Sequence, residues 1–200
     1  MRYIHTNLDG SIGIWATIPK KLIRDSDKKE FKIFGVRREN NQCFIYGEIE
    51  IAVGDMNFDV SDMPTDHIKG YTIVFPNFQS DILAKLPEKT RDQVKDFRIC
   101  TRVEIPADRT FRGAWIDTGK VDTDMTKARE IHKDNMRSAR KPKLEALDVE
   151  YMKALEAKDI AKQDEIIAKK QELRDVTEYP AIAEAKTSEE LKIVWPRILL

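Results

Sequence analysis

The 200-residue chain lacks an excess of charge of either sign, because 35 basic side chains balance 35 acidic ones. Domains that hold nucleic acid usually carry a net positive charge, since the phosphate backbone supplies most of the affinity. We therefore expect no nucleic-acid partner. Charged residues make up 35% of the chain and apolar residues 41%. This composition predicts a strongly charged surface around a core of adequate size.

One basic run, over residues 127–143, is interleaved with acidic residues and lacks stacking aromatic side chains. Nucleic-acid grooves combine a positively charged surface with stacking aromatic side chains. The run therefore indicates either a solvated helix face or a face turned toward an acidic protein. Its members are Lys127, Arg129, His132, Lys133, Arg137, Arg140, Lys141 and Lys143.

Long apolar runs are also missing. No stretch approaches the roughly 18 apolar residues that a membrane-spanning helix needs. Residues 1–15 lack the basic-then-apolar order of a signal peptide. The sequence thus predicts a protein without a membrane partner and without an export signal.

Cysteine is scarce, with only Cys43 and Cys100 in the chain. Each stands alone in an apolar, strand-like run, and no CxxC spacing occurs. Together with the missing export signal, this predicts two buried free thiols rather than a disulfide.

Motifs of enzymes and of metal sites are absent. The chain has no GxSxG, HExxH or glycine-rich phosphate loop, and its three histidines have no partner at metal-ligand spacing. Asp55, Asn57, Asp59 and Asp66 faintly resemble a calcium loop, but Val60 stands where the sharp turn requires glycine. We expect no catalytic residue, no cofactor and no metal.

The first half of the sequence has the pattern of antiparallel strands separated by turns. The segment 43–53 alternates apolar and polar side chains with period two, which is typical of a half-buried strand. Turn-forming residues at 7–10 and 38–41 indicate hairpins. We expect strands at 2–5, 12–18, 31–36, 43–53, 69–75 and 97–105, and short helices at 80–86 and 88–96.

From residue 122 the pattern becomes helical. Leu144, Leu147, Tyr151 and Leu155 follow one another at three- and four-residue spacing, so one stripe of this helix should face a partner. Pro142 lies within the same run. It should kink the helix or divide it in two, because proline removes a backbone donor and clashes with the preceding turn.

A return helix is expected over residues 160–176, with Ile160, Leu173 and either Ile167 or Ile166 on its inner side. Thr187 and Glu190 then have the spacing of a capping box, which predicts a short final helix.

The expected fold class is α+β, with an N-terminal antiparallel β-rich domain followed by a C-terminal helical hairpin. The β-rich domain spans 1–105, a linker spans 106–121, and the hairpin with its C-terminal short helix spans 122–200.

Several segments of the helical half carry a family resemblance. Arg140–Asp148, Lys170–Asp175, the Tyr179-Pro180 step and Val194–Pro196 resemble the tail fibre assembly chaperone domain of tailed bacteriophages. In that family an Arg-rich helix, a return helix ending in Leu-Arg-Asp and a closing Trp-Pro follow in this order. The block Ile105–Trp115 is similar to a linker found ahead of such hairpins in phage tail-region proteins.

The resemblance implies a phage tail-associated protein that binds tail fibres and assists their assembly, either transiently or as a retained part of the virion. Its location would be the virion tail, or the host cytoplasm during assembly. The partner would be a tail fibre or another tail protein, and self-association stays open. The alternative is a structural virion component, such as a fibre adaptor or tail decoration subunit, without chaperone activity. An enzyme acting on host glycan would require two carboxylates in one cleft.

Arginine and tryptophan are over-represented among interface hot spots, and these residue types guide the choice of contact residues. The candidate partner-binding residues are Arg109, Arg112, Trp115, Tyr179 and Trp195. A plainer interpretation of the 108–115 cluster stays open. In it, Phe111 and Trp115 anchor a linker onto the β domain while the arginines pair with nearby acids.

Overall fold

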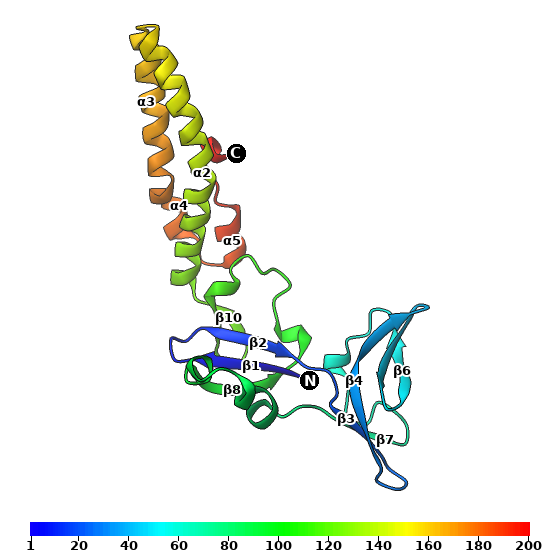
Figure 1. Cartoon of the computed structure of the whole chain (residues 1–200). Coiled ribbons are helices and arrows are strands. Elements are labelled where there is room, and N and C mark those ends of the chain that lie inside the picture. The colour runs from blue at the N-terminus through cyan, green and yellow to red at the C-terminus, as the bar shows by residue number, and fades with distance from the viewer. The chain divides into compact units, whose positions relative to one another are not determined.

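The computed structural model describes all 200 residues, and their contacts divide the chain into two units. Unit 1 comprises residues 1–107 and 116–121, and unit 2 comprises residues 108–115 and 122–200. The fold class is α+β, as the sequence predicts: antiparallel sheets come first and a helical hairpin follows (Figure 1). None of the helices combines the length and apolar character that crossing a membrane requires.

A three-stranded antiparallel sheet in unit 1 has the order β2-β1-β8. It consists of β1 (Arg2–Asn7), β2 (Ile12–Ala16) and β8 (Val94–Cys100). The turn from β1 to β2 is closed by Gly10, whose φ of +77° is a left-handed conformation that glycine adopts without steric cost. Beside this sheet the fully buried Phe78 stacks on Phe97, and the ring of Tyr3 lies tilted against Phe78.

A five-stranded antiparallel sheet forms the rest of unit 1, with the order β6-β5-β4-β3-β7. Its strands are β3 (Lys21–Arg24), β4 (Glu30–Glu39), β5 (Gln42–Gly47), β6 (Glu50–Asp55) and β7 (Tyr71–Val74). Asn40 and Asn41 link β4 to β5 with positive φ, the geometry of a type I′ hairpin turn. Leu22, Ile45 and Ile73 are among the side chains that build its core.

The predicted single strand over 43–53 is wrong, because the chain reverses within it to give β5 and β6. Tyr46 pairs with Glu50, so the reversal takes three residues. Gly47 permits it, since a Cβ there would lie 2.0 Å from the carbonyl oxygen of Lys32. A three-residue loop pairs residues of equal parity, and the period-two pattern therefore continues through the turn unchanged.

Two more predicted elements are shorter than expected. The helix over 88–96 ends early as α1 (Glu88–Arg91), because pairing with β1 draws the chain from Val94 onward into β8. The strand over 97–105 ends at Cys100 and is followed by a 3₁₀ turn at Arg102–Glu104. This turn is capped by the Glu104 carboxylate, which accepts a hydrogen bond from the Thr101 amide at 2.8 Å.

The remaining irregular turns of unit 1 are short. The helix expected at 80–86 is a π turn followed by a 3₁₀ turn, and the Asn77 side chain caps it by accepting bonds from the amides of Gln79 and Ser80. The turns lie at Val60–Asp62, Phe78–Ile82 and Leu83–Lys85.

Unit 2 is built on two antiparallel helices, α2 (Met125–Glu156) and α3 (Ile160–Asp175), which lie side by side (Figure 1). The side chains of Asp124 and Asp159 accept hydrogen bonds from first-turn amides and so begin the two helices. Lys158 has a φ of +56° in the turn between them. A segment with short helices follows: a 3₁₀ turn at Val176–Glu178, α4 (Pro180–Glu184), α5 (Ser188–Ile193) and a 3₁₀ turn at Arg197–Leu199.

Pro142 does not divide α2, so that part of the prediction is wrong. The helix continues through it from Met125 to Glu156. Proline leaves the carbonyl of the residue four positions earlier, Ser138, without its helical donor. Both Pro142 and Ser138 are exposed, so water can solvate that carbonyl and the helix persists.

The predicted linker over 106–121 divides between the two units. Residues 108–115 belong to unit 2, where Phe111 and Ala114 join the apolar cluster of the helices. The hairpin of β9 (Trp115–Asp117) and β10 (Val121–Thr123) follows, and residues 116–121 belong to unit 1. Phe111 is therefore anchored on the helical unit, not on the β domain as the plainer interpretation supposed, because its ring fits against His132 of α2.

The core of unit 2 is formed where residues 176–199, which we call the brace, pack against α2 and α3. Met136, Leu173 and Leu191 are almost fully buried there. Along α2 this cluster reaches as far as Leu147. The part of the hairpin within the cluster (residues 125–147 and 171–175) is called the base, and the part beyond it (residues 148–170) is called the tip.

Candidate functional site

The five predicted contact residues do not form a single site. Arg109 and Arg112 are exposed on the segment ahead of β9, and neither side chain forms an ion pair. Trp115 is buried, Trp195 is half-buried, and Tyr179 is 45% exposed. The structure thus separates two surface arginines and one surface tyrosine from a buried and a half-buried tryptophan.

Trp195 takes part in closing the brace onto α2. Its ring lies edge-on to His132, with ring centroids 5.4 Å apart, and Phe111 meets the same imidazole edge-on at 6.1 Å. The Nε2 atom of His132 lies 2.8 Å from the carbonyl oxygen of Val194, to which a protonated Nε2 donates a hydrogen bond. These contacts assign Trp195 a structural role.

Arg129 holds the other end of the brace. Its Nε donates a hydrogen bond to the carbonyl of Ile182 at 3.2 Å, and its Nη2 donates one to the carbonyl of Ala185 at 2.9 Å. These carbonyls lie at the end of α4, where a cation is favoured by the negative end of the helix dipole. The third nitrogen, Nη1, makes no hydrogen bond to the protein.

Next to this arginine lies a pocket of about 120 Å³, which contains the exposed Tyr179. Its lining combines cations, an aromatic ring and small apolar groups. The lining residues are Arg129, Lys133, Thr177, Glu178, Tyr179, Pro180, Ile182 and Ala183. We name it the Tyr179 pocket.

The sequence singled out Tyr179 but did not place Arg129 and Lys133 beside it. Both belong to the basic run, whose spacing of four residues puts the two side chains on one face of α2. The spacing of the basic residues therefore identified this face of α2. No sequence signal near residues 176–180 predicted the turn that brings Tyr179 against the face.

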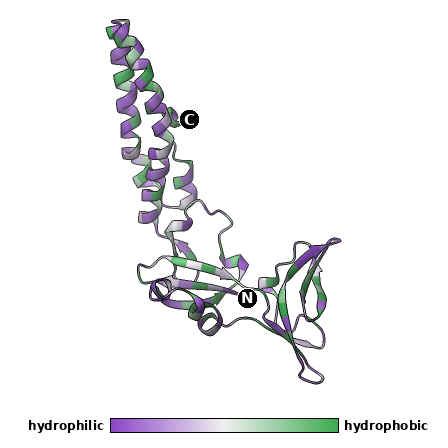
Figure 2. Cartoon of the chain, in the orientation of Figure 1, coloured by the Kyte–Doolittle hydropathy of each residue, from purple (hydrophilic) through white to green (hydrophobic).

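The hairpin tip is a second candidate contact surface. Three residues of the tip are buried: Ala154, Gln163 and Ile166. Gln163 links the helices by donating from its Nε2 to the carbonyl of Ala154 at 3.3 Å. Figure 2 shows hydrophobic and hydrophilic residues intermingled along this part of the hairpin.

Large apolar side chains on the tip remain half-exposed, with exposed fractions from 47% to 65%. They are Val149, Met152, Leu155, Ile160 and Ile167. The expectation that Ile160 faces inward is therefore wrong, and of the two isoleucines offered for the inner side it is Ile166, fully buried, that occupies it. With only one neighbouring helix, the tip cannot bury an apolar stripe as wide as the base does.

Several charges of the tip are paired along its surface. Glu165 binds both Lys162 at 2.9 Å and Lys169 at 2.6 Å, and the bonds from Lys169 first and Lys162 second lower the pKa of the Glu165 carboxyl to about 2. Lys170 binds Asp148 at 2.7 Å and lies over the ring of Tyr151. The Lys170–Asp148 pair connects the two helices, and the pairs of Glu165 lie along α3. The large apolar side chains of the tip remain exposed beside these pairs.

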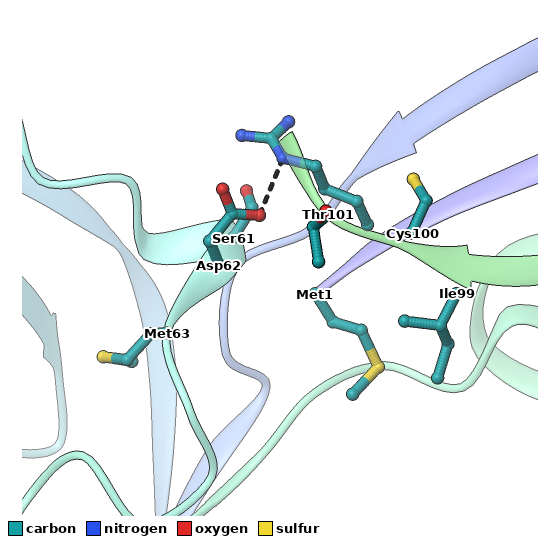
Figure 3. A pocket seen from close by; sticks show the side chains of 8 residues that line it. Met1, Ser61, Asp62, Met63, Ile99, Cys100 and Thr101 are labelled. Atoms are coloured by element: carbon teal, nitrogen blue, oxygen red, sulfur yellow. Dashed lines mark hydrogen bonds and ion pairs between the residues drawn. The ribbon is translucent and has the colours of Figure 1, made fainter. Parts of the chain in front are cut away.

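Unit 1 contains a pocket of its own, of about 160 Å³, at the end of β8 (Figure 3). Met1, Met63 and Ile99 provide apolar walls, and the ion pair between Arg2 and Asp62 lies at its edge. Burial, and secondarily the charge of Glu104, raise the pKa of the Cys100 thiol in this pocket to about 11. This thiol is therefore protonated at neutral pH and is a poor nucleophile.

The acidic loop that faintly resembled a calcium site has a different arrangement. Asp59 caps the 3₁₀ turn at Val60–Asp62 and forms ion pairs with Arg2 and Arg102. No three side chains of the metal-binding types come together anywhere in the chain. Both cysteines are buried and unpaired, which confirms the prediction of free thiols.

Comparison of the chain with protein-family models, with curated proteins and with solved structures finds no match. The resemblance to the tail fibre assembly domain therefore rests on the segments quoted in the sequence analysis.

Proposed function

We propose that this protein is a phage tail-associated protein that binds tail fibres and assists their assembly. The partner is a tail fibre or a neighbouring tail protein, and the work is done by binding alone. The resemblance of the helical half supports the choice of partner. The exposed tip of the hairpin supports the mode of binding.

One observation carries the proposal: the tip of the hairpin exposes large apolar side chains that no other part of unit 2 covers. Fully burying such a side chain is worth about 1.5–3 kcal/mol, so covering one that is half-exposed contributes about 1 kcal/mol. Covering all five would contribute about 5 kcal/mol toward a contact with a partner. A fibre subunit whose own apolar surface is still open before trimerisation would offer the complementary face.

The paired charges of the tip support the same interpretation. Lys162, Glu165 and Lys169 already pair with one another, so these three side chains need no counter-charge from a partner that covers the apolar groups. A polar rim around apolar anchors is the usual organisation of a protein interface.

Co-expression of the protein with a phage tail fibre tests the proposal. The wild-type protein should co-purify with the fibre, and a double variant, Met152→Ser with Ile167→Ser, should lose most of this binding. The matched control changes two exposed polar neighbours on the same tip, Glu156→Ser with Asp164→Ser, and should bind like the wild type. Failure of the wild type to capture any tail protein would contradict the proposal.

Mass spectrometry of purified particles then separates the two forms of the function. A protein that co-purifies with the fibre but is absent from finished virions is a transient chaperone. Stoichiometric presence in the particle would instead identify a structural component, such as a fibre adaptor or tail decoration subunit.

A further inference from the structure

The Tyr179 pocket offers a positive site enclosed by apolar groups. We propose that it binds a carboxylate side chain on an acidic, partly apolar surface segment of the partner protein. The inference rests on the proposed function in one respect, since it takes that partner to be the tail protein that the hairpin tip contacts.

Arg129 is the fixed cation of the site. Its bonds to the carbonyls of Ile182 and Ala185 orient the guanidinium, and its Nη1 remains without a partner in the chain. A guanidinium that is already held on one edge loses little conformational entropy when its other donors bind a ligand. Bonds from arginine to a carboxylate are charge-assisted and are among the strongest that side chains form.

Lys133 is the adjustable cation. It lies one helical turn beyond Arg129, and its Nζ is 3.2 Å from the carboxylate of Glu130. Glu130 is largely exposed, and an ion pair of this kind contributes little to stability. The lysine can therefore turn from Glu130 to a ligand carboxylate at small cost.

Tyr179 and its neighbours give the site its apolar side. The tyrosine is 45% exposed, and its hydroxyl makes no hydrogen bond within the protein. Pro180, Ile182 and Ala183 line the same pocket. A ligand that fits both parts carries a carboxylate next to an aliphatic or aromatic group, as an acidic surface segment of a protein does.

The charge around the pocket favours a single carboxylate over a chain of phosphates. Glu178 lines the pocket and Glu130 pairs with Lys133, so these two acids limit the negative charge that the site can accept to about one ligand carboxylate. Nucleic acids are held by extended arrays of cations, whereas this site has two. The zero net charge of the whole chain points in the same direction.

Titration of the isotope-labelled full-length protein with a capped dipeptide, N-acetyl-Leu-Glu-amide, tests the site without any tail protein. Backbone and side-chain resonances of Arg129, Lys133 and Tyr179 should shift together, and N-acetyl-Leu-Gln-amide should shift them much less. Equal shifts with the two peptides, or no shifts at millimolar peptide, would overturn the inference. Stronger binding of oligothymidylate at the same residues would also overturn it, in favour of a phosphate ligand.

A charge reversal separates this inference from the proposed function. Lys133→Glu should weaken the binding of the co-expressed tail protein about tenfold, as expected for loss of one charge-assisted contact. The control, Lys141→Glu, changes an exposed lysine of the same helix outside the pocket and should leave binding unchanged. Wild-type capture that Lys133→Glu does not weaken contradicts the pocket assignment alone. Dipeptide shifts without any capture of tail protein contradict the proposed partner and leave the carboxylate site standing.

Discussion

The base and the tip of the α2–α3 hairpin belong to the same two helices but have different surroundings. At the base, the brace covers both helices, and Met136, Leu173 and Leu191 are almost completely buried. At the tip, each helix has only the other as a neighbour, and Ile160 and Ile167 stay half-exposed. An amphipathic stripe alone therefore does not decide which side chains are buried. A third packed element decides it, because the apolar stripe of a helix is wider than one neighbouring helix can cover.

The largest loss of stability is expected from truncating a buried side chain of the base. Leu173→Ala should lower the free energy of unfolding of unit 2 by about 3 kcal/mol, because it removes a fully buried side chain and leaves a cavity. Urea unfolding followed by circular dichroism measures the loss. The matched tip variant, Ile167→Ala, should cost less than about 1 kcal/mol, since half of that side chain is already in water. Equal losses would show that base and tip do not differ.

Trp195→Ala should have the next largest effect, and it should act on the brace. A buried tryptophan loses about 3–5 kcal/mol on truncation, and the half-buried Trp195 should lose about 2 kcal/mol. Limited trypsinolysis should then cut residues 176–199 faster while unit 1 resists as before. Unchanged cleavage of the brace would mean that the His132 contact does not hold it.

Pro142→Ala should change the stability of the base in the opposite direction. Proline in a helix interior costs up to about 3 kcal/mol, so its removal should raise the stability of unit 2 by at least about 1 kcal/mol. Hydrogen exchange should slow most for the amides of α2 on either side of residue 142. A destabilising result would show that the proline is needed within the base of the hairpin.

The smallest effect should come from the ion pairs of the tip. Because the pKa of Glu165 in the folded protein is about 2, below its ordinary value of 4.5, the folded state binds this proton more weakly than the unfolded state. Its stabilisation is complete above pH 4.5 and is lost as the pH falls toward 2. NMR titration should show α3 near Glu165 loosening over this range. In Glu165→Gln, this acid-dependent change should be absent at the tip.

Sequence patterns identified the two halves of the fold because their periods differ, two in the first half and about 3.6 in the second. They missed the reversal between β5 and β6 for a geometric reason. Tyr46 pairs with Glu50, and equal parity across the turn keeps the alternation intact. The close approach of Gly47 to Lys32, which marks the turn, depends on a strand distant in the sequence.

The candidate site was only partly accessible from the sequence. The basic run identified the helix face that carries Arg129 and Lys133, and the Tyr-Pro step identified Tyr179, but their meeting depends on the path of the brace. The sequence could not decide between Ile166 and Ile167 for a similar reason. Both lie near the apolar edge of α3, and only the direction of α2 decides which one is buried.

The position of the brace at the end of the chain affects the order in which the parts of the hairpin can fold. Residues 176–199 are synthesised after both helices of the hairpin, so the apolar cluster of the base cannot close while the ribosome is still producing them. The tip needs no later segment for its own contacts, such as the bond from Gln163 to Ala154. The nascent hairpin is therefore complete at its tip before it is complete at its base.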